Sequence, residues 1–160
     1  MKTALVLFSL LAAAGVAHSA GTVQISFVTP EKFTDVRDRS HRVEDNVKAL
    51  EKVLIDVAKP HVADGQTLTI EVLDVDLAGE VRPGARAWDL RVLRGRADWP
   101  RITLRWRLEG AGAPRGGEAV VQDMAYLQGI QPPLSQTHLV YERRMLDEWF
   151  KKELGGQAVN

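Results

Sequence analysis

The chain has 160 residues, of which 45% are hydrophobic and 26% are charged, and it contains no cysteine. The absence of cysteine excludes disulfides, thiolate metal sites and cysteine nucleophiles, so the fold must be held together by packing. The 21 basic and 21 acidic residues give a formal net charge of +0, which leaves no overall field to attract nucleic acid or anionic lipid.

The first segment of the chain, residues 1–19, is predicted to be a signal peptide. Lys2 is followed by an apolar run over residues 4–16, and small residues precede Ala20, which is the pattern of an export signal. The apolar run is too short to remain as a membrane span, which needs roughly 20 residues. No lipid anchor is expected, because a bacterial lipoprotein carries its acyl chains on a cysteine. We therefore expect residues 20–160 to lie in the periplasm.

Two segments with clear periodicity follow. Apolar residues occupy alternate positions over residues 22–28, which predicts a half-buried strand. Over residues 40–59 apolar residues recur at helical spacing, which predicts a helix with one apolar face. Ser40 is predicted to cap this helix and Pro60 to end it.

The segment over residues 67–77 is predicted to be one strand in which the apolar positions change parity. They are even-numbered up to Val72 and odd-numbered from Leu73 onward. One extra residue restores the inward face after such a slip, so we predict a β-bulge near Val72 and Leu73. A further strand is predicted over residues 88–92, where apolar and charged residues alternate.

The clearest strand covers residues 102–108, where every second residue is apolar and the residues between them are Thr or Arg. A glycine-rich loop leads to its predicted hairpin partner over residues 118–124. A final helix is predicted over residues 136–154. Its buried face is expected to carry Leu139, Leu146 and Phe150.

The order of these elements is strand, helix, four strands, helix. It predicts an α+β fold, specifically a two-layer sandwich in which a mostly antiparallel sheet of about five strands has two helices packed on one face. The opposite face of the sheet is then expected to be open to water. No repeat or linker divides residues 20–160, so we expect a single domain.

The strand residues that point away from the helices are charged in both signs. The candidate binding residues among them are Asp74, Asp76, Asp89, Arg91, Arg105 and Arg107, and Asp123 is a further candidate binding residue. Opposite charges on neighbouring strands form pairs that contribute about 0.2–1 kcal/mol each, so one interpretation is a lattice of solvated ion pairs. The functional interpretation is a polar docking surface for an envelope protein or for an anionic glycan or lipid.

Asp74 and Asp76 occupy alternate positions of one strand, which places both carboxylates on one face within reach of a hard cation. Two ligands are too few for calcium, which takes about six to eight oxygens, and Asp123 would add a third acid if its strand lay nearby. We assign no metal, no cofactor and no catalytic residue. A small carboxylate- or metal-dependent hydrolase built on Asp74, Asp76 and Asp123 is the alternative function.

Residues 82–107 contain a local excess of arginine over acidic residues. The tryptophans of this segment argue against binding of nucleic acid. Trp88 and Trp106 have the parity of inward-facing strand residues, and Trp99 precedes a proline in a loop. We predict that all three belong to the core rather than to a platform on which bases stack.

Several short segments together resemble a known family. In chain order they are D-V-D-L-A-G from Asp74, D-L-R-V from Asp89, D-W-P-R-I from Asp98, D-M from Asp123 and Y-E-R-R-M-L-D-E-W-F from Tyr141. Because they occur together and in order, the chain resembles the exported bacterial family called domain of unknown function 3016. The resemblance implies export and supplies no activity and no catalytic residues. We therefore predict a non-enzymatic binding or accessory module of the cell envelope.

Overall fold

The computed structural model describes residues 20–36, 42–82, 90–95, 97–110, 112–128 and 139–155. The predicted signal peptide lies outside this part of the chain, as do Ser40, Trp88 and Asp89. Within it, no helix is both long enough and apolar enough to cross a membrane.

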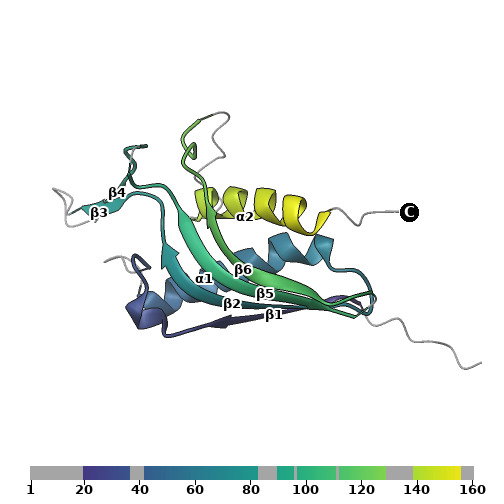
Figure 1. The fold of residues 1–160 in the computed structure, drawn as a ribbon. Coiled ribbons are helices and arrows are strands. Elements are labelled where there is room, and N and C mark those ends of the chain that lie inside the picture. Colours follow the sequence, from purple (N-terminus) through teal and green to yellow (C-terminus); the bar gives the residue numbers. More distant parts are fainter. Residues whose placement is uncertain are drawn as a thin grey trace, which may run out of the picture.

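The main sheet has four strands in the order β1-β2-β5-β6. These strands are β1 (Thr22–Phe27), β2 (Thr67–Asp76), β5 (Arg101–Glu109) and β6 (Arg115–Gln122). β1 pairs with β2 in parallel, and the other two pairings are antiparallel. The helices α1 (Val43–Ala58) and α2 (Val140–Glu153) lie side by side on one face of the sheet (Figure 1). The predicted α+β class and its two layers are confirmed.

The parallel pairing of β1 with β2 follows from the helix between them, because parallel neighbours need a crossover connection. The first turn of α1 is fixed by Asp45, whose carboxylate accepts a hydrogen bond from the backbone N–H of Arg42 at 3.3 Å. The helix ends at Ala58, and a short 3-10 turn over Lys59–His61 contains the predicted stop, Pro60. The predicted helix is therefore confirmed from Val43 onward.

The predicted bulge in β2 is confirmed. Val72 pairs with Leu104 of β5, and the next paired residue of β2 is Asp74, so Leu73 is the extra residue. Val72 and Val75 are both completely buried although their positions differ by an odd number. The bulge thus keeps apolar residues under the helices along the whole of β2.

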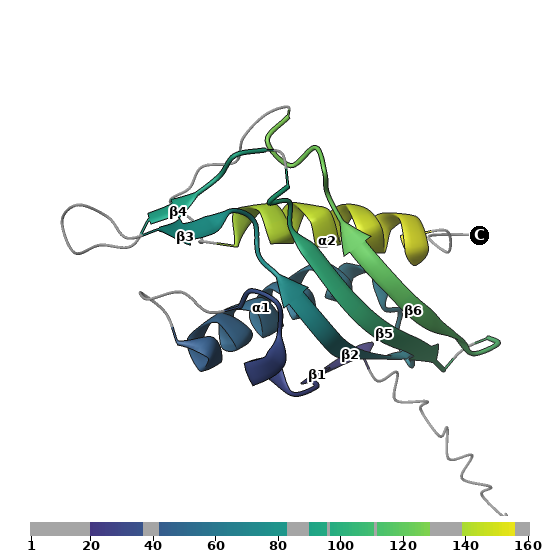
Figure 2. The same cartoon turned by 60° about the vertical axis from the view of Figure 1, so that its left-hand side comes forward.

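The segment predicted as a further strand of the sheet lies elsewhere. β4 (Leu90–Val92) pairs with β3 (Glu80–Arg82) in a separate two-stranded ribbon, which projects beyond the end of the main sheet (Figure 2). Gly79 turns the chain into this ribbon with a φ of 80°, and a Cβ at this position would approach the carbonyl oxygen of Val92 to 2.7 Å. The main sheet consequently has four strands where about five were expected.

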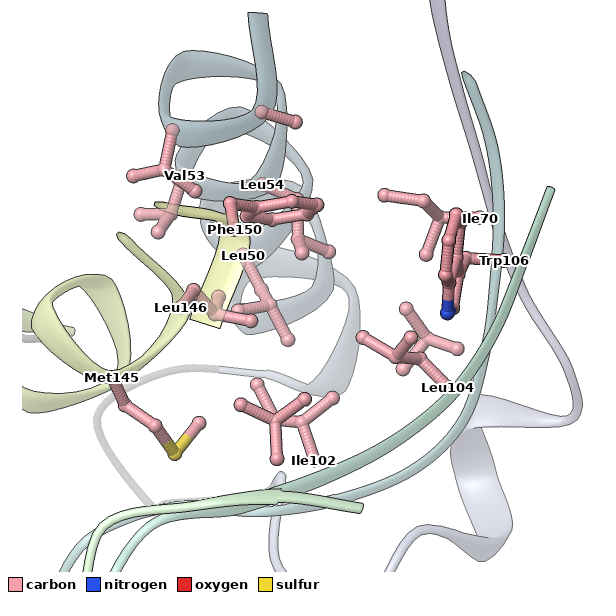
Figure 3. Packing of buried hydrophobic residues seen from close by; sticks show 14 of the residues in the cluster. Leu50, Val53, Leu54, Ile70, Ile102, Leu104, Trp106, Met145, Leu146 and Phe150 are labelled. Carbon is pink, nitrogen blue, oxygen red and sulfur yellow. The ribbon is translucent and has the colours of Figure 1, made fainter. Parts of the chain in front are cut away.

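The core lies between the two helices and the covered face of the sheet (Figure 3). Its central side chains are Leu50 and Leu54 of α1, Ile70 of β2, Ile102, Leu104 and Trp106 of β5, and Leu146 and Phe150 of α2. The ring of Trp106 packs edge-on against that of Trp149, with centroids 6.2 Å apart. The predicted core position of Trp106 and the predicted buried face of the last helix are confirmed.

Candidate functional site

The face of the sheet that the helices do not cover is called the open face, and it carries most of the predicted binding residues. Its charged side chains over β2, β5 and β6 are Glu71, Asp74, Asp76, Arg101, Arg105, Arg107, Glu109 and Glu118. The buried residues of β5 alternate with these, so Leu104 is fully buried while Arg105 beside it is exposed. The alternation read from the sequence therefore assigned the two faces of β5 correctly.

The arginines of the open face are paired with acids. Arg105 lies in register between Glu71 and Glu118, and its guanidinium bonds both carboxylates, at 2.8 Å and 3.3 Å. Arg107 bonds Glu109 on its own strand at 2.8 Å, although 65% of its side chain stays exposed. Exposed pairs of this kind are screened by salt and contribute little to stability. They leave a surface whose arginines already have partners and whose five acids outnumber its three arginines.

Asp74 and Asp76 lie on the open face, and each has its own partner. The carboxylate of Asp74 accepts hydrogen bonds from the backbone N–H and the hydroxyl of Thr34, at 2.7 Å and 2.8 Å. Asp76 accepts one from Arg101 at 2.9 Å. Partial burial raises the pKa of Asp76, with Arg101 opposing the shift and Asp74 adding to it.

Asp123 does not lie on the open face with Asp74 and Asp76. It follows β6, and its carboxylate accepts a hydrogen bond at 2.8 Å from Arg144 of α2, on the helix side of the sheet. Among the described residues, no group of three His, Cys, Asp or Glu side chains could hold a metal ion. The acidic cluster that the hydrolase alternative needs is therefore not assembled in this part of the structure.

Arg91 was predicted on the open face, but it belongs to the separate ribbon. Its Nη1 donates to the carbonyl oxygens of Ala78 and Gly79, at 2.8 Å and 3.1 Å, and to the carboxylate of Asp35 at 3.3 Å. Arg91 therefore ties the ribbon to the end of the sheet. Asp89, predicted beside it, lies outside the described residues.

Glu142 of α2 is a buried acid that the sequence analysis did not single out. It is only 1% exposed, and its Oε1 accepts a hydrogen bond from the backbone N–H of Ala78 at 2.8 Å. Its Oε2 and the Nη2 of Arg91 are buried without a hydrogen-bond partner in the described part of the structure. Burial raises the pKa of Glu142, opposed by the N–H of Ala78 and the charge of Arg91.

The burial of Glu142 could have been predicted from helical spacing. Glu142 is three residues after Leu139 and four before Leu146, so it shares their buried face because residues at these separations lie on one side of a helix.

A small second core lies beside Glu142, where Tyr126, Tyr141 and Ala78 pack together with Trp99 against them. The prediction that Trp99 belongs to the core is confirmed. The hydroxyl of Tyr126 donates to the carboxylate of Asp98 at 3.0 Å. Burial raises the pKa of Tyr126 to about 12, and the bond to Asp98 adds to the shift, so this hydroxyl stays protonated at neutral pH.

Comparison with known proteins gives one family. The family model described as "Protein of unknown function (DUF3016)" matches residues 21–152. No curated protein matches the chain. Among solved structures, a minor lipoprotein from Acinetobacter baumannii is similar over 82% of this chain and 87% of that chain, with 12% identity and a TM-score of 0.27. A likeness this weak carries no argument about fold or function.

Proposed function

We propose, from the premise that the chain belongs to the DUF3016 family of proteins of unknown function, that it is a non-enzymatic binding module of the bacterial cell envelope. In this proposal the open face docks another envelope protein. The observation that carries it is a sheet face left uncovered by both helices and lined by ion-paired polar side chains. The signal-like pattern of residues 1–19 supports placement in the periplasm.

The charge of the open face favours a protein partner over an anionic glycan or lipid. Arg105 is shared by two glutamates and Arg107 is bonded to Glu109, so an anion would have to break these pairs. The excess of acids over arginines on the face would also repel it. A protein surface with interspersed lysines and arginines matches the face in charge.

Site-specific crosslinking in cells tests this docking. A photo-crosslinking amino acid replaces Arg107 or its register neighbour Thr69, and Lys52, exposed on α1, is the control position. We expect one discrete adduct with another envelope protein from both open-face positions and none from Lys52. Adding Glu118→Lys to the chain that carries the probe at Thr69 should abolish the adduct, because it puts a positive charge on the face opposite the lysines and arginines of the partner. Equal labelling from Lys52, or no adduct from either open-face position, would contradict the proposal.

The hydrolase alternative has its own test. Asp74 is bonded to Thr34 and Asp76 to Arg101. We therefore expect that a chain carrying Asp74→Asn or Asp76→Asn still supplies every envelope function that a deletion strain lacks. Complementation of the deletion strain by each variant measures this. Loss of function in both variants, with an unchanged unfolding transition and an unchanged adduct from Thr69, would favour chemistry at these carboxylates over docking.

A further inference from the structure

The outer edge of β6 pairs with no strand of the described structure, and Figure 2 shows it on the side of the sheet opposite β1. An exposed edge is a template for pairing with another chain, and proteins usually block it with lysine, proline or a bulge. β6 has the sequence R-G-G-E-A-V-V-Q and pairs with β5 without a register shift. β6 contains no lysine, proline or bulge, and no described strand pairs with its outer edge, so among the described residues this edge is open to pairing.

The hydrogen-bonding groups that β6 offers can be identified. The N–H of Asp123 donates to the carbonyl oxygen of Pro100, directly opposite. Because hydrogen-bonded and non-hydrogen-bonded pairs alternate along an antiparallel ladder, the odd-numbered residues of β6 bond to β5. The residues whose N–H and C=O groups point to the free edge are therefore Gly116, Glu118, Val120 and Gln122.

We propose that two copies of this chain pair through β6, antiparallel, about a two-fold axis at Ala119. This register matches opposite charges at both ends of the strand, because Arg115 of one copy lies opposite Asp123 of the other. Both side chains are on the helix side of the sheet, where Arg115 donates to the carbonyl oxygen of Glu153 and Asp123 accepts from Arg144. The two facing charges attract each other across the axis without either of these bonds having to break. The free edges then supply two hydrogen bonds for each of the four facing pairs.

The neighbouring registers are less favourable. Centring the axis on Glu118 would place two glutamates directly opposite each other, which is destabilising. Centring it on Val120 would place Arg115 opposite Ala125 and lose both end pairs. The other edge strand of the described sheet, β1, has no charged residue between Thr22 and Phe27, so it offers no such match.

Side-chain size also suits this pairing. Gly117 and Ala119 are the small residues on the helix side of the strand, which leaves room for Val121 of the second copy opposite Gly117. On the open face, Val120 is 58% exposed and would be partly covered by the facing strand. The pairing joins the two four-stranded sheets, with both open faces on the same side. It thereby doubles the surface proposed above for docking.

Single-cysteine crosslinking tests the pairing and its register, because the native chain contains no cysteine. Ala119→Cys would place two thiols on the axis, where facing Cβ atoms are about 4.5–5.5 Å apart, close enough to form a disulfide with a small adjustment. We expect this variant to become a covalent dimer under mild oxidation, while Glu118→Cys and Val120→Cys crosslink much less. Ser26→Cys on β1 is the control and should stay monomeric.

Sedimentation of the purified protein measures the association itself. We expect a monomer–dimer equilibrium that Val120→Pro abolishes, because the N–H of Val120 faces the free edge and its loss leaves the β5 ladder intact. Val120→Lys should act in the same way, and Gln24→Lys on β1 should not. A native protein that stays monomeric up to about 1 mM, the weak end of specific association, would overturn the proposal. So would crosslinking of Ser26→Cys as efficiently as Ala119→Cys. Neither result depends on the docking partner.

Discussion

Replacing Leu104 by alanine is expected to lower the free energy of unfolding by about 2–5 kcal/mol. Leu104 is completely buried on β5, between the sheet and the two helices (Figure 3). Its truncation loses the burial of the leucine side chain and leaves a cavity that the packed neighbours fill only in part. Urea unfolding of the native protein and of Leu104→Ala measures the difference.

The matched control is the next residue of the same strand. Arg105 points to the open face and is held by two exposed glutamates, so Arg105→Ala should change the stability far less. Any change in stability caused by Arg105→Ala should become smaller as salt is added, because salt screens exposed ion pairs. Equal destabilisation by the two variants would mean that β5 is not covered on one face only.

Replacing Glu142 by glutamine is expected to change how the stability of the protein depends on pH. Burial raises the pKa of Glu142 above its usual 4.5, so the folded protein holds this proton to a higher pH than the unfolded chain does. The contribution of Glu142 to stability is therefore fully present below pH 4.5 and is lost as the pH rises through the raised pKa. The loss cannot exceed about 1.4 kcal/mol per pH unit.

In Glu142→Gln this loss should be absent, because the amide stays neutral and its oxygen still accepts the N–H of Ala78. The difference in unfolding free energy between the variant and the native protein, measured from about pH 4 to pH 8, should shift in favour of the variant as the pH rises. Glu148→Gln, at an exposed position of the same helix, is the control and should show no such trend. A difference that stays constant with pH would place the carboxyl of Glu142 in contact with solvent.

Arg91 lies close enough to Glu142 for its charge to act on the pKa of that acid, and its Nη2 has no hydrogen-bond partner among the described residues. Arg91 bonds Asp35 and two carbonyl oxygens through Nη1 alone, and no ion pair joins it to Glu142 among the described contacts. Its positive charge lowers the pKa of Glu142, but burial raises that pKa by more. Because burial outweighs this attraction, and because Oε2 of Glu142 has no hydrogen-bond partner among the described residues, ionisation of Glu142 would weaken the junction between the ribbon, the end of β2 and α2.

The sequence alone determined both helices, the two faces of β5 and the bulge in β2. These features depend on local periodicity, which indicates whether each residue lies on the buried or the exposed side of its own helix or strand. The change of parity at Val72 and Leu73 is a local signal of the same kind. For the same reason, the positions of Arg105 and Arg107 on the open face could be predicted without knowing any neighbouring strand.

Only the tertiary structure decided which segments meet. Periodicity does not say which strand pairs with which, so Arg91 was placed in the sheet although its strand forms a separate ribbon. Periodicity also does not say which side chain faces a residue at the end of a strand. Asp123 bonds Arg144 of α2, whereas Asp76 bonds Arg101. Glu142 could be assigned to the buried face of α2 from its spacing, but its contact with Ala78, 64 residues away, exists only because folding brings the end of β2 against that helix.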